Sequence, residues 1–244
     1  TVVLLIFPSN LSTAALLFSM VLILAFVAHY PLRYLLTICG MGLAFVLLFF
    51  LLVKAFPSQF PNRIDTWMSR IENFSSGQSD DGNYQVARAK TAIVSGKIFG
   101  LGAGKSRMKN FLPQSSSDFI YAIIVEEFGL LGGIGLILLY LLLLFRIVVI
   151  AHNTLNLFGK LTVVGLGIPI IFQAFINIGV ALQVLPVTGQ NLPMISSGGT
   201  SAWMTCIAMG IILSVSVKRA EADEVEQENE TTNNPISILS ETHY

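Results

Sequence analysis

The sequence predicts an all-α, multi-pass membrane protein. Of its 244 residues, 54% are hydrophobic and 11% are charged, whereas a soluble domain carries about 25% charged residues. Five apolar segments come close to or exceed the roughly 20 residues that a helix needs to cross a bilayer. The formal net charge is zero, so overall charge gives no indication of a nucleic-acid partner.

The five transmembrane helices are expected, in chain order, over residues 11–28, 34–54, 119–145, 161–182 and 200–217. Residues 1–7 are apolar but too few to span, and they look like the end of an earlier helix that stops near Pro8. No basic n-region precedes them, so no signal peptide is expected. The predicted organisation is 1–54 with two spans, a long loop over 55–118, three spans over 119–217 with a short loop at 183–199, and an acidic, disordered tail over 218–244.

The middle of the long loop, Ala87 to Ala103, is apolar enough to suggest a sixth span. Arg88, Lys90 and Lys97 interrupt it, and a charge near the bilayer centre costs about 2.5–3.5 kcal/mol. We therefore expect an amphipathic helix at the membrane surface.

Basic residues in the short connections set the expected orientation. His29 with Arg33, then Arg146 with His152 and Lys160, and finally Lys218 with Arg219 alternate to one side of the membrane. That side is predicted to be cytoplasmic. The 55–118 loop and the 183–199 loop then lie outside, and the C-terminal tail lies in the cytoplasm.

Asp118 closes the polar loop and opens the third apolar segment. An acid at the mouth of a membrane helix is close enough to water to ionise, which suits a group that transfers protons. Asp is also a favoured residue for capping a helix N-terminus. The spacing by itself favours neither interpretation.

The segment Gly100 to Ser106 resembles a phosphate-binding P-loop, but that motif needs a glycine where Phe99 stands. A nucleotide site is therefore rejected. What remains is a flexible Gly-rich segment followed by Lys105, Arg107 and Lys109. These bases either contact lipid headgroups or bind an anionic substrate such as a lipid pyrophosphate.

Several polar residues lie within the predicted spans. On a continuous helix Glu126 would lie about 12 Å from Asp118, too far for the close carboxylate pair of a glycosidase, so Glu126 and Glu127 are expected to pair inside the bundle. Gln173 and Asn177 share one helix face and are expected to hydrogen-bond to a neighbouring helix.

The 183–199 loop has two prolines and three glycines. It is expected to be a partly re-entrant turn that lines a cavity near Asp118, because irregular backbone at membrane depth must be buried in protein or line water. Cys39 and Cys206 are read as small buried hydrophobes, and His29, His152 and His243 are isolated, so no metal site is predicted.

Taken together, ordered motifs make the chain resemble the SEDS family, the FtsW/RodA/SpoVE proteins of bacteria. The motifs are Gly82-Asn83-Tyr84-Gln85, Leu112-Pro113 with Asp118-Phe119-Ile120, Glu126-Glu127-Phe128-Gly129, Asn177-Ile178-Gly179, Leu185-Pro186-Val187-Thr188-Gly189, Leu192-Pro193-Met194-Ile195-Ser196 and Gly198-Gly199-Thr200-Ser201. Ser197 stands where the family usually has Tyr. Family members have about ten spans, so the chain resembles their C-terminal half, and Gln190 to Met194 is most similar to the FtsW-like division branch.

The resemblance implies a peptidoglycan glycosyltransferase that polymerises lipid II during cell division. By this analogy Asp118 is the general base of an inverting transfer, and undecaprenyl pyrophosphate is the leaving group. Lys105, Arg107 and Lys109 are the candidates for holding the pyrophosphate, and a divalent cation such as Mg²⁺ or Mn²⁺ could assist them. Further substrate-binding candidates are Gln85, Ser196, Gly198 and Gly199.

The implied partners are a class B penicillin-binding transpeptidase and other division proteins, in the bacterial inner membrane. Two other functions fit the same sequence features. A lipid II flippase would also use a basic loop and a cavity, and a scaffold of the division machinery would need neither catalysis nor transport.

Overall fold

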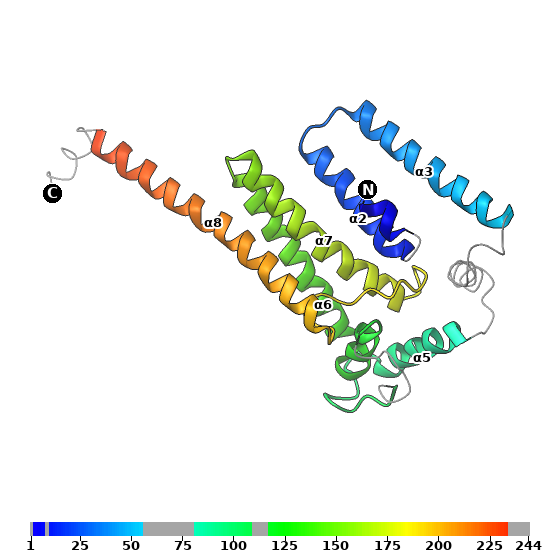
Figure 1. The fold of residues 1–244 in the computed structure, drawn as a ribbon. Helices are drawn as coiled ribbons and strands as arrows, with labels where there is room; N and C mark the ends of the chain where they lie inside the picture. The colour runs from blue at the N-terminus through cyan, green and yellow to red at the C-terminus, as the bar shows by residue number, and fades with distance from the viewer. Residues whose placement is uncertain (1, 8–9, 56–80, 109–116, 234–244) are drawn as a thin grey trace.

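A computed structural model describes residues 2–7, 10–55, 81–108 and 117–233 of the chain. Its elements are α1 (Val2–Ile6), α2 (Leu11–Val27), α3 (Leu32–Ala55), α5 (Asp81–Gly96), α6 (Ile120–Asn153), α7 (Leu157–Ala181) and α8 (Gly199–Asn233). These residues include no strand. Figure 1 shows α6, α7 and α8 as a bundle, with α2 beside α7 and α3 beyond α2. The predicted all-α architecture is confirmed.

Four of the described helices are long and apolar enough to cross a membrane. They are α3 over Leu32–Leu51, α6, α7, and α8 over Gly199–Val217. The 17 residues of α2 rise about 26 Å, which is at the lower limit for a span. The chain is therefore a multi-pass membrane protein, and each predicted span corresponds to one of these helices.

The third span differs from its prediction in two ways. It ends at Asn153 rather than near 145, so Arg146 and His152 lie on the helix and not in the connection to α7. It is also interrupted at Gly129, whose backbone has φ 73° and ψ −173°. Hydropathy reads both halves as one apolar segment, because a single glycine barely changes a local average.

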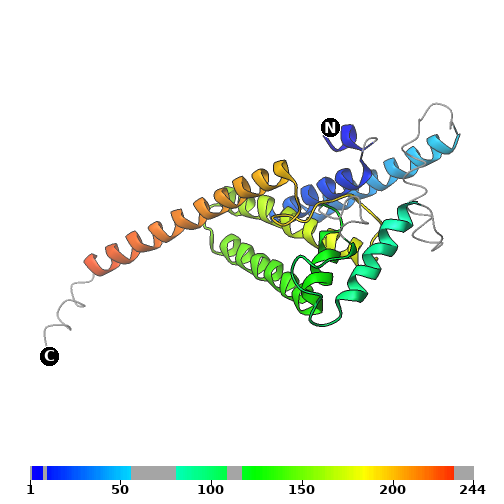
Figure 2. The ribbon, with the colours of Figure 1, turned by 90° about the horizontal axis from the view of Figure 1, so that it is seen from below.

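The acidic segment 221–230 was predicted to be disordered, and this was wrong for the described residues. Helix α8 continues through it to Asn233, and Figures 1 and 2 show the helix extending away from the bundle. Glu dominates this part of the sequence, with Ala and Gln beside it, and all three are strong helix formers.

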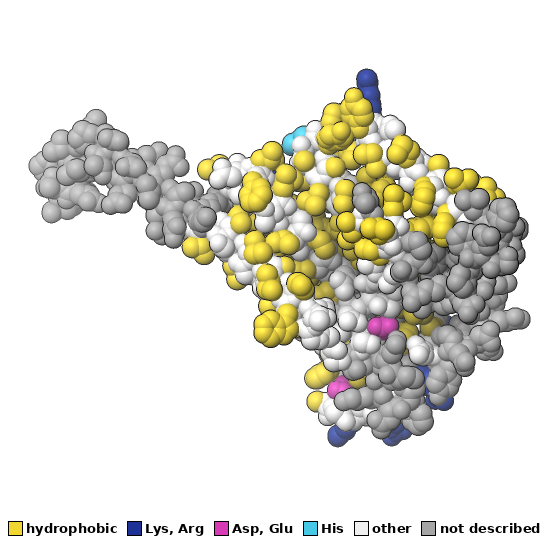
Figure 3. All heavy atoms as spheres, viewed as in Figure 1, with side chains coloured by type: hydrophobic (Ala, Val, Ile, Leu, Met, Phe, Trp, Pro, Cys, Tyr) yellow, Lys and Arg dark blue, Asp and Glu magenta, His cyan; other side chains and the backbone are white. Residues whose placement is uncertain are grey.

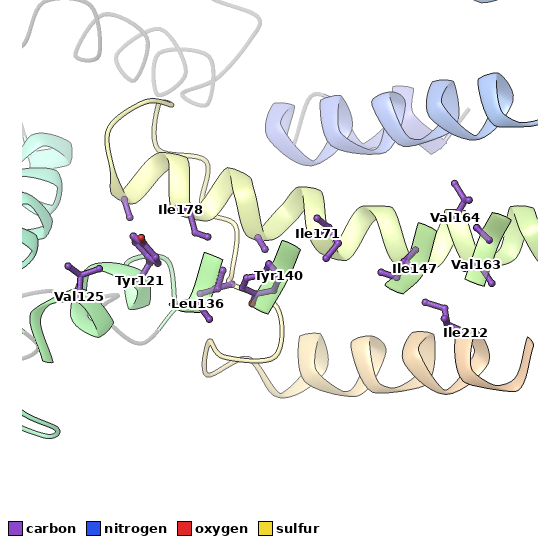
Figure 4. Packing of buried hydrophobic residues seen from close by; sticks show 14 residues of the cluster. Tyr121, Val125, Leu136, Tyr140, Ile147, Val163, Val164, Ile171, Ile178 and Ile212 are labelled. Atoms are coloured by element: carbon purple, nitrogen blue, oxygen red, sulfur yellow. The ribbon is translucent and has the colours of Figure 1, made fainter. Parts of the chain in front are cut away.

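The core of the bundle lies where α6, α7 and α8 meet. Figure 4 shows apolar side chains from the three helices pointing toward one another. Fully or nearly fully buried members include Ile147, Val163 and Ile212, one from each helix. At Gly167 a Cβ atom would approach Ile147 Cδ1 to 2.9 Å, so the glycine lets α6 and α7 lie close together.

The opposite faces of these helices carry exposed apolar side chains, as Figure 3 shows over the bundle. Examples are Leu139 and Leu142 on α6, and Trp203 on α8. Cys39 and Cys206, which we predicted to be buried, are both exposed. An apolar sequence context does not separate a core position from a lipid-facing one, because both environments are apolar.

The bundle has two chemically different ends. At one end α5 packs against α6 (Figure 2), and Gln190 of the α7–α8 loop donates to Thr13 Oγ1 at the start of α2 over 3.2 Å. At the other end His29, Tyr30 and Lys160 line one open pocket. We call the first the α5 end. It carries Asp118 and the Gly-rich segment.

Candidate functional site at the α5 end

Residues of α5, of the segment after it, of the start of α6 and of the α7–α8 loop meet in one small apolar cluster at the α5 end. Ala89 and Ala92 of α5 pack with Phe119, and Met108 and Val187 pack against the same cluster. Phe119 follows Asp118, Met108 lies within the basic segment, and Val187 belongs to the α7–α8 loop. The cluster therefore brings the acid, the basic segment and the irregular loop into one region.

Helix α5 is amphipathic, as predicted. Its buried positions Ala89, Ala92 and Gly96 recur at spacings of three and four residues, while Lys90 and Lys97 are exposed. The buried residues are small, and a Cβ atom at Gly96 would overlap Val125 O of α6. Their size is what allows α5 to approach α6 so closely.

Asp118 lies beside the α7–α8 loop and is half-buried. Its Oδ2 atom is 3.7 Å from the position that a Cβ atom would take on Gly189, whose φ of +68° favours glycine. Phe119, and not Asp118, occupies the N-cap position of α6. Asp118 thus borders the loop, and a cavity between them stays a prediction.

Asn177 connects Asp118 to that loop. Its Nδ2 atom donates to Asp118 O over 2.9 Å and to Gln190 O over 2.7 Å, and the residue is 1% exposed. Gln173, one turn away on α7, donates to Asn191 O over 3.1 Å. The pair was predicted to bind a neighbouring helix. It instead holds backbone carbonyls of the loop and of the residue before α6.

Two further contacts confirm that the α7–α8 loop is re-entrant. The Tyr140 hydroxyl donates to Pro193 O, although Tyr140 lies about 16 Å along α6 from the break at Gly129. Ser196 Oγ donates to Ser117 O over 2.6 Å and accepts from Leu192 N over 2.8 Å. The loop therefore dips beside α6 and returns to the residue that precedes Asp118.

The break in α6 is bridged by backbone from the segment after α5. Leu101 N donates to Glu126 O and Gly102 N to Glu127 O, each over 2.9 Å. In return Leu130 N donates to Lys97 O over 2.9 Å. A membrane-embedded break must have its free backbone groups satisfied, and this crossing segment satisfies them.

Glycine is required where the two backbones cross. Gly129 and Gly100 have φ values of +73° and +79°, and a Cβ atom on either would overlap backbone of the other segment. The Gly-rich segment, which we rejected as a nucleotide loop from its sequence, forms one side of this crossing. The sequence did not reveal that Gly100 of this segment lies against Gly129, so that both backbones need glycine at the crossing.

Glu126 is completely buried at this crossing, with 0% exposure. Its carboxylate accepts from Arg107 N over 3.1 Å, from Met108 N and Ser95 Oγ over 3.4 Å each, and from Ser106 Oγ. We call these contacts the Glu126 clasp. Glu126 was predicted to pair inside the bundle, and it instead holds the segment that carries the basic residues.

The predicted substrate-binding residues have different environments. Lys105 and Arg107 are exposed and Gln85 is half-buried, whereas Lys109 lies outside the described residues. Their contact with substrate stays a prediction.

Ser196, Gly198 and Gly199 lie between the loop and α8. The Ser196 hydroxyl is engaged with backbone, so it positions Ser117. A Cβ atom on Gly198 would be 2.9 Å from Asn191 Nδ2, whereas one on Gly199 would meet no atom within 4 Å. Gly198 is therefore a packing position, and Gly199 borders open space.

The fold and the site define a class: a polytopic helical membrane protein with an acid, a basic segment and a re-entrant loop gathered at one end. A family model described as "Cell cycle protein", that of FtsW, RodA and SpoVE, matches residues 1–221. The chain belongs to this family, so the resemblance in its motifs is confirmed.

Individual relatives support the same family assignment. A "Probable peptidoglycan glycosyltransferase FtsW" of Xanthomonas oryzae pv. oryzae is 41% identical over 166 residues, which are 66% of this chain and 34% of that protein. "Stage V sporulation protein E" of Bacillus subtilis is 42% identical over 134 residues, 54% of this chain and 37% of that protein. The chain thus spans well under half the length of these relatives.

A solved structure gives the same result for the fold. It is described as "Structural coordination of polymerization and crosslinking by a peptidoglycan synthase complex". Its matched chain is 29% identical with a TM-score of 0.65, over 89% of this chain and 59% of that one. The likeness covers almost the whole described bundle.

Proposed function

We propose that the protein polymerises lipid II into glycan strands during cell division, with Asp118 as the general base. The observation that carries the proposal is the meeting of Asp118, the Lys105–Arg107 segment and the re-entrant loop around one cluster. The names of the relatives, which include probable peptidoglycan glycosyltransferases, support the same reaction class.

The proposed glycosyl transfer needs few catalytic groups. The 4-hydroxyl of the acceptor GlcNAc attacks C1 of the donor MurNAc, the bond from C1 to the pyrophosphate oxygen breaks, and undecaprenyl pyrophosphate leaves. A positioned carboxylate that takes the hydroxyl proton contributes about 10²–10⁴-fold. A single displacement inverts the anomeric centre, so one base and a stabilised leaving group are enough.

Lys105 and Arg107 are proposed to stabilise the departing pyrophosphate. Both are exposed, and charge-assisted hydrogen bonds to phosphate are about twice as strong as neutral ones. Gln85, Lys109, Gly198 and Gly199 are proposed as further substrate contacts, and Ser196 as a residue that both positions Ser117 and borders the substrate.

We propose that a divalent cation, Mg²⁺ or Mn²⁺, assists the reaction next to Asp118. Among the described residues, the buried atoms Asn177 Oδ1 and Thr188 Oγ1 have no hydrogen-bond partner, and Mg²⁺ prefers oxygen ligands. The Asp118 carboxylate and these oxygens are the groups that would hold it. When bound, the cation would offset the negative charge of a pyrophosphate.

The α5 end is proposed to face the exterior of the bacterial inner membrane, with the C-terminus in the cytoplasm. The pocket residues His29 and Lys160 gather at the opposite end, as expected for the cytoplasmic side. The complex that coordinates polymerization and crosslinking supports a class B penicillin-binding transpeptidase as the partner, together with other division proteins.

The test uses the full-length protein with its transpeptidase partner and labelled lipid II. Asp118→Asn should abolish glycan polymer at normal expression, a loss of about 10²-fold or more. Glu127→Gln is the matched control, since the Glu127 carboxylate makes no hydrogen bond or ion pair with any described residue. Full polymerisation by Asp118→Asn would exclude it as the base. Transfer of lipid II across liposomes without polymer would identify a flippase instead, and neither activity would identify a scaffold.

A further inference from the structure

Glu126 and Glu127 are adjacent and chemically identical, yet the structure treats them differently. Glu127 is half-buried, whereas Glu126 is 0% exposed and meets four donors. All four donors come from outside α6, from the end of α5 and from residues 106–108. The Glu126 side chain therefore binds residues 106–108, a segment that begins 20 residues earlier in the sequence.

Every contact of the Glu126 side chain is one in which the carboxylate accepts. Arg107 N and Met108 N can only donate, and they reach different oxygens, Oε1 and Oε2. An ionised carboxylate has acceptor sites on both oxygens. A glutamine of the same size would turn an NH₂ group toward one of the two N–H groups and lose that contact.

The segment is bound to α6 at Leu101 and Gly102, and the clasp holds it again from Ser106 onward. Gly100, Gly102 and Gly104 all have positive φ angles, and glycine-rich backbone is intrinsically mobile. Lys105 N donates to Gly102 O over 3.1 Å, and a Cβ atom on Gly102 would be 3.4 Å from Lys105 Cδ. Lys105 therefore sits on a turn whose far end is held by the clasp.

Among the described residues, Arg107 makes its hydrogen bond through the backbone. Its N–H group donates to Glu126, and its side chain is exposed. The clasp thus anchors the backbone between two cations and leaves both cations available to solvent and ligand. Preorganisation of this kind increases affinity, because the ordering entropy is not lost on binding.

We infer that Glu126 is a positioning residue for Lys105 and Arg107, presenting them to the pyrophosphate of a lipid-linked sugar. This inference rests on the proposed function for the identity of the ligand. The clasp itself is a separate structural statement, so the two are tested by separate measurements.

The first measurement needs no catalytic activity. Full-length protein in detergent is treated with trypsin, and mass spectrometry follows cleavage after Lys105 and after Arg107. Glu126→Gln should speed both cleavages about tenfold or more, because cleavage reports local opening of the segment. Glu127→Gln should cleave like the wild type. Unchanged cleavage in Glu126→Gln would overturn the clasp, whatever the enzyme does. If Glu126→Gln fails to fold, Ser106→Ala removes a single donor and should give a smaller increase in cleavage rate; no increase there would also overturn it.

The second measurement is steady-state polymerisation at varied lipid II concentration. Glu126→Gln should raise KM about tenfold, the effect of weakening one charge-assisted contact, with kcat changed about twofold or less. In a Lys105→Ala/Arg107→Ala background the same substitution should add no further rise in KM. A fall in kcat at constant KM, or a full additional rise in that background, would overturn the positioning role. If the wild type makes no polymer, the proposed function fails while the trypsin result still decides the clasp.

Discussion

The middle of the bundle and its α5 end are held together by different interactions. In the middle, the interactions are apolar side-chain packing, as at Ile147, Val163 and Ile212. At the α5 end, Asn177, Ser196 and Glu126 make hydrogen bonds, mostly with backbone groups. In a bilayer, moving an apolar side chain from lipid to protein gains little transfer free energy, whereas an unsatisfied backbone group is expensive.

The comparison indicates which changes the protein tolerates. Apolar packing is spread over many atoms, so a single substitution removes a small fraction of it. The α5 end depends on a few atoms, each of which satisfies backbone that no neighbouring turn could satisfy. The interactions that fix a single arrangement of the chain are therefore concentrated at the α5 end. The backbone is least regular there, and Asp118 lies there as well.

The largest effect is expected for Gly129→Ala. A Cβ atom there would overlap Ile98 O at a φ of +73°, so the substitution should destabilise by about 3 kcal/mol or more. Thermal unfolding of the full-length protein in detergent measures this. Gly135→Ala is the control, since its Cβ atom would meet nothing within 4 Å and alanine favours a helix by about 0.5–1 kcal/mol. Similar melting temperatures for the two variants would refute the requirement for glycine at the break.

A smaller loss is expected for Asn177→Ala. Asp118 O and Gln190 O would lose their amide donor, and each unsatisfied buried group costs about 1–3 kcal/mol. We expect the free energy of unfolding to fall by about 2 kcal/mol. Polymerisation should fall by more than the loss of folded protein explains, because Asp118 is displaced. Asn156→Ala is the matched control: Asn156 is exposed and makes no capping hydrogen bond through its side chain. Equal activity of the two variants would count against the link between Asn177 and Asp118, the proposed base.

The smallest effect is expected in the middle of the bundle, for Gly167→Ala. Its Cβ atom would press on Ile147, 2.6 Å from Cγ2 and 2.9 Å from Cδ1. Overpacking of this kind costs about 1–3 kcal/mol, which is partly offset by the preference of about 0.5–1 kcal/mol of a helix for alanine over glycine. Because the strain comes from Ile147, Ile147→Ala should destabilise the Gly167→Ala variant less than it destabilises the wild type. Thermal melts of the four proteins in this cycle measure the coupling. Strict additivity would show that α6 and α7 shift apart instead, and Gly210→Ala, with no atom within 4 Å, controls for helix propensity.

Much of the architecture was predictable from local sequence. Apolar runs located α2, α3, α6, α7 and α8, and the charges at Arg88, Lys90 and Lys97 indicated the amphipathic helix that α5 forms. The motifs around Asp118 and in the 183–199 loop also indicated the family. These features are readable because hydropathy and motif spacing are properties of adjacent residues.

The contacts of the site were not predictable in the same way. Asn177 and Asp118 are separated by 59 residues, and Ser196 and Ser117 by 79. Gln173 and Asn177 shared a helix face as expected, but the sequence could not say that their partners are loop carbonyls. For Glu126, the run Glu126-Glu127-Phe128-Gly129 beside a Gly-rich segment was the available signal, yet nothing in it separates the two acids.

By itself the sequence determined that this chain is a membrane protein, which segments form its helices, and which acid lies at the start of a helix. These features can be read because a helix that faces lipid must be composed mostly of apolar residues. Only the tertiary structure decided that α6 breaks at Gly129, that Glu126 faces the Gly-rich segment, and that Asn177 binds Asp118 O. Those outcomes depend on which backbone groups are left unsatisfied once the helices pack, and such groups become neighbours only in the folded chain.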